Sequence, residues 1–347
     1  MSKKLTEFNP GSGCGCKMSP ADLREMLEGS GQPMSFDQLI VGHGTSDDAA
    51  VWKREDGSLL LHTTDFFTPI VDDAFDFGRI AATNALSDIY AMGGKPTTAL
   101  AILGWPVDEL PLEQASRVIA GAREVCQDAG IPLAGGHSIN LPSPIFGLSV
   151  TGEATPTTLI SNADAEPGDL IFLTKPLGIG MMATAIKKGI ASVEDVQWSL
   201  DVMTQLNDIG ASIAEISEVH AMTDVTGFGL LGHLLEMCRA SNVSAVLDWD
   251  KIPALPQGRL EEMVASFCLP QGTTKNYSDF VQDINQINGK ELALLCDPQT
   301  SGGLLISAAP SVADLVATML AENGWYAEPI GHIVAEQSPR VTLRRKD

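Results

Sequence analysis

The N-terminal half of the sequence contains four aspartates whose positions favour metal or phosphate chemistry. Asp47 and Asp48 are adjacent, and Asp65 ends the stretch Leu61-His-Thr-Thr-Asp65. Asp88 lies in a segment whose apolar residues cover most of a helix and leave one polar stripe, made of Thr83, Asn84, Ser87 and Asp88. Such a helix is expected to be buried, and a buried carboxylate needs a partner. Each acid alone fits a cap or a solvated group, whereas the four together also fit a divalent-metal site.

Two cysteines lie in a glycine-rich stretch near the N-terminus, Gly11-Ser-Gly-Cys14-Gly-Cys16-Lys17. A nearby cation such as Lys17 favours the reactive thiolate form of cysteine, and the glycines leave it accessible on a mobile arm. The Cys-x-Cys spacing is poor for structural zinc, and no second ligand pair is visible. The stretch therefore indicates a reactive cysteine, the alternative being a tail without a role.

A Gly-x-Gly-x-x-Gly pattern occurs at Gly227, Gly229 and Gly232. The strand before it is short and polar, which favours a loop that presents Asp224 and starts a helix capped by Thr226 over a dinucleotide site. The Gly-Gly pairs of Gly135-Gly-His137-Ser138 and Pro298-Gln-Thr-Ser-Gly-Gly303 could contact phosphate or form ordinary turns. No P-loop pattern occurs, so any ATP must be held chiefly through metal.

Hydrophobic periodicity predicts the elements that position these residues. In the first half, after a short helix over 19–29, we expect strands at 51–52, 59–64, 99–103 and 145–151 and helices at 76–92 and 112–129. In the second half, we expect strands at 170–174, 221–223, 245–248 and 303–307 and helices at 196–215, 230–241 and 312–323. The irregular strand spacing predicts an α+β fold.

A polar, proline-containing stretch over 154–169 predicts the connection between two domains. The expected division is an arm with a short helix over 1–38, an N-terminal domain over 39–155 and a C-terminal domain over 156–347. The length of 347 residues agrees with two domains.

Composition excludes several classes of protein. The chain has 44 acidic and 22 basic residues and a net charge of −22, so we expect no nucleic-acid partner. No apolar run approaches the ~18 residues of a membrane helix, and the start lacks a secretory signal, so we expect no membrane partner and a cytoplasmic location. The widely spaced Cys126, Cys238, Cys268 and Cys296 are expected to be buried.

Long motifs over nearly the whole chain resemble the selenophosphate synthetase (selenide, water dikinase) family. They are Gly13-Cys14-Gly-Cys16-Lys17, Asp47-Asp-Ala-Ala-Val, Thr63-Thr-Asp65-Phe-Phe, the segment from Arg79 to Gly94, Ala134-Gly-Gly-His137-Ser138, Thr174-Lys-Pro-Leu-Gly, the segment from Met222 to His233, and Cys296-Asp-Pro-Gln-Thr-Ser-Gly-Gly.

The resemblance implies two α+β domains like those of aminoimidazole ribonucleotide synthetase, and a homodimer whose N-terminal strands form a barrel. The implied reaction converts ATP, selenide and water into selenophosphate, AMP and orthophosphate, for selenoprotein and seleno-tRNA synthesis. Magnesium is the implied cofactor, with a monovalent cation such as K+ as a further candidate.

By position in the motifs, Cys14 is the implied catalytic residue and Lys17 its basic partner near the phosphates. The implied magnesium ligands are Asp48, Asp88 and Asp224. The implied ATP contacts are Thr45, Ser46, Asp47, Asp65 and Asp88, with Gly136, His137 and Ser138 reaching the nucleotide from the other subunit.

Two alternatives to this function stay open at the level of sequence. One is another ATP-dependent synthetase or kinase of the same superfamily, against which the Cys-Gly-Cys-Lys arm argues. The other is a non-catalytic thiol carrier of metal or selenium. Some family members have selenocysteine where this chain has Cys14, and the role of Cys16 is open.

Overall fold

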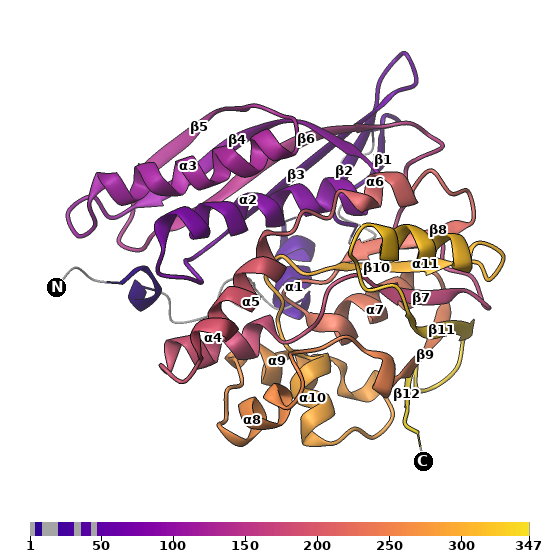
Figure 1. The fold of residues 1–347 in the computed structure, drawn as a ribbon. Helices are drawn as coiled ribbons and strands as arrows, with labels where there is room; N and C mark the ends of the chain where they lie inside the picture. The colour runs from indigo at the N-terminus through magenta and orange to yellow at the C-terminus, as the bar shows by residue number, and fades with distance from the viewer. Residues whose placement is uncertain (1–3, 9–19, 31–35, 43–46, 347) are drawn as a thin grey trace.

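Two six-stranded sheets with flanking helices form the chain (Figure 1). The computed structural model describes residues 4–8, 20–30, 36–42 and 47–346. The expected α+β class is confirmed, because almost all strand pairs are antiparallel. None of the helices in these ranges combines the length and apolarity needed to cross a bilayer.

The N-terminal sheet has the strand order β1-β2-β3-β6-β4-β5, with only β4 and β5 parallel. Its strands are β1 (Leu39–Val41), β2 (Ala50–Lys53), β3 (Leu59–Phe67), β4 (Lys95–Trp105), β5 (Leu133–Asn140) and β6 (Ile145–Ala154). The short elements η1 (Leu5–Phe8) and α1 (Pro20–Gly29) precede it. Along β3, buried residues alternate with more exposed ones, as expected for a sheet with helices on one face only.

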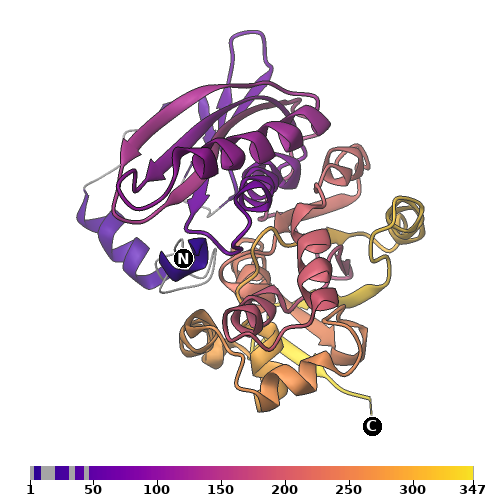
Figure 2. The same ribbon diagram turned by 60° about the vertical axis from the view of Figure 1, so that its left-hand side comes forward.

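Helices α2 (Ala74–Ala91) and α3 (Leu112–Asp128) cover that buried face (Figures 1 and 2). Asp73 caps α2 by accepting hydrogen bonds from the backbone of Phe75 and Asp76. The two helices cross closely: a Cβ on Gly78 would lie 1.9 Å from the carbonyl oxygen of Val118. Glycine at this crossing lets α2 sit deep enough to be buried on nearly every side.

The C-terminal sheet has the strand order β12-β9-β11-β7-β10-β8, with only β12 and β9 parallel. Its strands are β7 (Leu170–Leu173), β8 (Val219–Asp224), β9 (Val243–Asp248), β10 (Leu304–Ala308), β11 (Pro329–Ala335) and β12 (Val341–Arg344). Its helices are α4 (Ile179–Lys187), α5 (Val193–Thr204), α6 (Ile209–Ile213), α7 (Gly229–Ala240), α8 (Arg259–Ala265), α9 (Gln271–Phe280), α10 (Gly289–Leu295) and α11 (Ala313–Glu322), with short turns η3 (Trp249–Lys251) and η4 (Val281–Asp283).

Three local expectations are wrong. The helix expected over 196–215 is two helices, α5 and α6, separated by an irregular segment that contains Asn207. The Gly135-Gly136-His137 stretch is part of strand β5 and not a turn. Helix α7 is preceded by Phe228 without a side-chain cap, so Thr226 is not its cap; the Thr226 hydroxyl lies 3.4 Å from Nε2 of His233.

Helix α2 lies at the junction of the two domains (Figures 1 and 2). It packs against β3 and β6 on one side and against α5, α6 and β8 on the other. Its polar stripe therefore faces the C-terminal domain, where the side chain of Asn207 donates hydrogen bonds to the Ser87 hydroxyl and to the carbonyl of Gly302, both at 2.8 Å.

Candidate metal and nucleotide site

Three aspartates from separate parts of the chain meet at this junction. Asp48 precedes β2, Asp88 lies near the C-terminal end of α2, and Asp224 is the last residue of β8. One carboxylate oxygen from each lies within 4.8 Å of those from the other two. The cluster thus joins two acids of the N-terminal domain to one acid of the C-terminal domain.

Two threonine hydroxyls orient the carboxylates. Thr223 donates a hydrogen bond to Oδ1 of Asp48 at 3.0 Å, and Thr63 of β3 donates to Oδ2 of Asp88. The other oxygen of Asp48, Oδ2, is buried and has no hydrogen-bond partner among the residues that the structure describes. A buried acceptor in this state is costly unless a cation or proton occupies the site.

Without a bound cation, the three clustered carboxylates are electrostatically unfavourable. Burial raises the pKa of Asp48 well above its ordinary value, and the charges of Asp224 and Asp88 raise it further. Hard divalent cations take carboxylate oxygens as ligands, and such an ion would relieve both the repulsion and the desolvation. The donor set therefore fits magnesium.

The other two predicted acids lie beside the cluster in different settings. Oδ1 of Asp47 accepts a hydrogen bond from the backbone of Asn162 at 2.9 Å, which connects it to the segment between the domains. Asp65 points from β3 toward α2, where its Oδ2 accepts from the side chain of Asn84 at 2.6 Å. Both acids are thus held in place by groups outside the cluster.

The remaining predicted residues are not brought together here. Cys14, Cys16, Lys17, Thr45 and Ser46 lie outside the described residues. Gly136, His137 and Ser138 lie on the exposed strand β5 at the sheet edge. Because β6 and β4 stand between β5 and β3, these three residues are remote from the Asp65 strand of their own chain.

The dinucleotide interpretation of the glycine pattern finds no support in the topology. The pattern does connect a strand, β8, to a helix, α7. However, β8 is an edge strand paired antiparallel with β10, and β9, the next strand along the chain, lies at the other side of the sheet. The parallel βαβ unit that such a site requires is therefore absent at this position.

Sequence reasoning missed the buried polar residues at the domain junction. Thr63 and Thr223 donate hydrogen bonds to the aspartates. Lys175, Asn207 and Ser301 form the hydrogen-bond network around them. Only the polar stripe of α2 gave a signal for such contacts, because a polar stripe on a buried helix must meet polar partners.

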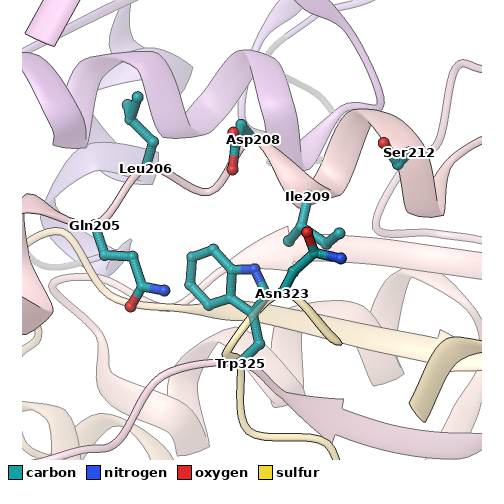
Figure 3. A pocket seen from close by; sticks show the side chains of 7 residues that line it. All are labelled: Gln205, Leu206, Asp208, Ile209, Ser212, Asn323 and Trp325. Carbon is teal, nitrogen blue, oxygen red and sulfur yellow. The ribbon is translucent and has the colours of Figure 1, made fainter. Parts of the chain in front are cut away.

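A separate pocket of about 360 Å³ opens between the segment around α6 and the end of α11. Figure 3 shows the indole of Trp325 between the side chains of Gln205 and Asn323. Its lining also includes Leu206, Asp208, Ile209 and Ser212, and none of the three clustered aspartates.

Comparison with known proteins places the chain among proteins of this architecture. The family described as AIR synthase related protein, N-terminal domain, matches residues 46–154, and the corresponding C-terminal domain family matches residues 166–344. A solved thiamine-monophosphate kinase from Stenotrophomonas maltophilia shares the fold, with a TM-score of 0.66 and 21% identity over 93% of this chain and 94% of its own.

Curated relatives are much more similar. A protein from Colwellia psychrerythraea named selenide, water dikinase is 50% identical over 342 residues, covering 99% of both chains. A Shewanella protein (strain MR-7) of the same name is 51% identical over 330 residues, covering 95% of this chain and 92% of its own. The chain therefore belongs to the selenide, water dikinase family.

Proposed function

We propose that this protein uses ATP, selenide and water to make selenophosphate, with release of AMP and orthophosphate, in the cytoplasm. The observation that supports this reaction is the sequence identity of about 50% to selenide, water dikinases over almost the entire chain. The product would supply selenoprotein and seleno-tRNA synthesis.

Asp48, Asp88 and Asp224 are the proposed magnesium ligands. Their support is the convergence of three carboxylate oxygens and the buried Oδ2 of Asp48. Magnesium bound there would neutralise phosphate charge, which is the main requirement of phosphoryl transfer. The hydroxyls of Thr63 and Thr223 keep the carboxylates turned toward a common point. A monovalent cation such as K+ is a further candidate, without a site assigned among these residues.

The nucleotide would lie beside this cluster. Asp47 and Asp65 border it and are held by Asn162 and Asn84. Together with Asp88 and with Thr45 and Ser46, they form the proposed ATP-contacting set. Lys17 would neutralise charge on the transferring phosphate, and Cys14 would handle the selenium species, since selenide is a soft nucleophile that needs shielding more than base catalysis.

A homodimer would complete the site with Gly136, His137 and Ser138 of a second copy. Large apolar side chains are exposed on strands of the N-terminal sheet, among them Trp52, Phe66, Leu100 and Ile139. The edge strand β5 is long and exposed, a feature that proteins normally cover. Light scattering should give a dimer for the wild type and a monomer for Leu100→Glu; a wild-type monomer would contradict this arrangement.

Phosphorus NMR of an anaerobic mixture of protein, ATP, magnesium and selenide tests the reaction directly. We expect AMP, orthophosphate and a phosphorus signal coupled to selenium. ADP as the only lasting product would instead indicate a kinase of the wider superfamily, and no turnover would indicate a carrier. Cys14→Ser should lose selenide-dependent turnover; full activity in this variant would remove the cysteine from the mechanism.

A further inference from the structure

Lys175 is a fully buried lysine that the proposed reaction does not use. It follows β7, and 1% of its surface is exposed. Its Nζ donates hydrogen bonds to the carbonyl of Gln205 at 2.7 Å and to the carbonyl of Ser301 at 3.0 Å. Burial lowers its pKa to about 7, against the opposite effect of Asp224. Its two hydrogen bonds connect the chain after β7 to the segment before α6 and to the segment around Ser301.

The residue that Lys175 holds, Ser301, is also held from the N-terminal domain. Its backbone N–H donates to Oδ1 of Asn84 at 2.8 Å, and the amide of the same Asn84 donates to Asp65. Ser301 has a φ of +53°, a left-handed conformation that is unfavourable for a residue with a side chain. Hydrogen bonds at both its N–H and its carbonyl keep it there.

The loop over residues 299–303, which we call the brace loop, also packs against the chain next to Asp224. The backbone N–H of Val225 donates to the carbonyl of Gly303 at 2.9 Å, and the N–H of Gln299 donates to the carbonyl of Thr226 at 3.0 Å. A Cβ on Gly302 would lie 1.9 Å from the carbonyl oxygen of Val225, so the approach allows only glycine. The brace loop thus contacts the segment after Asp224 and the helix that bears Asp88.

We infer that Lys175 is a positioning residue of the proposed metal site: by anchoring the brace loop, it fixes the spacing between Asp88 and Asp224. The inference rests on the proposed metal-binding function of the cluster. These two acids belong to different domains, and the brace loop is hydrogen-bonded to both sides through Asn84 and Val225. Without its anchor, the loop and Asp224 can shift relative to α2.

If Lys175 is replaced by a neutral residue, its charge and its anchoring role predict opposite changes in the affinity for a cation. The ammonium group is a like charge to a metal ion, so removal of its charge alone would strengthen cation binding. Loss of an anchor would weaken binding, because residues that orient metal ligands typically contribute about 10- to 100-fold in affinity. The sign of the change therefore distinguishes a positioning role from a purely electrostatic one.

The experiment is a Mn²⁺ titration of the full-length protein, followed by electron paramagnetic resonance. Lys175→Met should raise the Kd for Mn²⁺ by about tenfold or more. Ser307→Ala is the matched control, since it removes a buried hydrogen bond, to Asp169, in the same sheet and should leave the Kd unchanged. An unchanged or lower Kd in folded Lys175→Met would overturn the inference.

Asn84→Ala provides a second test on the other side of Ser301. It should also weaken Mn²⁺ binding, and its combination with Lys175→Met should weaken binding by less than the product of the two effects, because both residues hold the backbone of Ser301. An unchanged Kd in Asn84→Ala would likewise overturn the inference. By contrast, failure of the wild type to bind Mn²⁺, or wild-type binding by Asp224→Asn, would refute the proposed metal site itself.

Discussion

Two buried acidic sites in this chain differ in how their charge is balanced. At the domain junction, Asp48 shares its surroundings with Asp88 and Asp224. Asp297, in the loop after α10, lies outside this cluster. Its Oδ2 accepts hydrogen bonds from the backbone of Gly180, at the start of α4, and from the side chain of Gln299, both at 2.9 Å. Burial is the main reason why the pKa of Asp48 and that of Asp297 are both raised.

An unpartnered oxygen does not by itself distinguish a metal site from a structural acid. Oδ2 of Asp48 and Oδ1 of Asp297 are both buried without a hydrogen-bond partner in the described part of the chain. What differs is the neighbourhood: Asp297 can satisfy itself by holding a proton, whereas three adjacent carboxylates repel one another and gain most from a cation. The comparison predicts that metal dependence is confined to the cluster.

The largest effect is expected from Asp224→Asn. Loss of one ligand carboxylate should reduce magnesium-dependent selenophosphate formation by about a hundredfold, measured by phosphorus NMR. The matched variant Asp297→Asn should retain wild-type turnover per folded molecule. Equal losses in the two variants would erase the distinction between the two sites.

Magnesium should stabilise the wild type by about 2.7 kcal/mol at a hundred times its Kd, and Asp224→Asn by much less. Unfolded Asp48 titrates near its ordinary pKa of 3.8, and the folded residue well above it. Between these values the folded protein binds more protons, so the metal-free protein loses stability as the pH rises.

Denaturant unfolding at a series of pH values above 3.8, with magnesium or with a chelator, measures this slope. Magnesium should remove the contribution of the cluster to the slope of stability against pH. The contribution of Asp297 to this slope has the same sign and should remain with magnesium. It should disappear in Asp297→Asn. A slope unaffected by magnesium would show that the cluster does not bind the ion.

A smaller effect is expected from Thr223→Val, which removes the hydroxyl that donates to Asp48. The carboxylate loses an orienting group, so the Kd for magnesium should rise by about tenfold in a calorimetric titration. Ser199→Ala, which removes a buried hydrogen bond within α5, is the control and should not change the Kd. If both variants bind magnesium equally well, Thr223 has no orienting role.

The smallest effect on metal binding is expected at Asp297. Asp297→Ala leaves the Gly180 N–H and the Gln299 amide without their acceptor, at a cost of about 1–3 kcal/mol in the free energy of unfolding. Because Gln299 belongs to the brace loop, the magnesium Kd of this variant should rise, but by less than the roughly tenfold expected for Thr223→Val. A rise as large as that of Thr223→Val would mean that Asp297 supports the metal site as directly as the orienting threonine does.

The sequence allowed the main elements and the candidate ligands to be predicted, because periodicity marks buried faces and acids on a buried helix need partners. The strands around Leu59–Phe67 and Ile145–Ala154 and the buried α2 were expected from such patterns. Those patterns made Asp47, Asp48, Asp65 and Asp88 candidates for a metal site, whereas Asp224 was added as a ligand by the resemblance to the selenophosphate synthetase family.

The supporting contacts could not be predicted in this way. Lys175 and Ser301 are 126 residues apart in sequence and meet only in the folded chain. Strand β5 was missed because its Gly135-Gly136 pair is typical of a turn, and the break between α5 and α6 was missed because apolar residues continue through it. Such features depend on tertiary packing, which local patterns do not encode.

The distribution of the cluster over both domains has a consequence for synthesis of the chain. Domains generally fold in order as they leave the ribosome, so α2 with Asp88 can be in place long before β8 delivers Asp224 and the brace loop follows. A truncated chain that ends before β8 would contain Asp48 and Asp88 but would lack Asp224. Binding of the proposed magnesium ion would therefore have to wait until β8 and the brace loop have been synthesised.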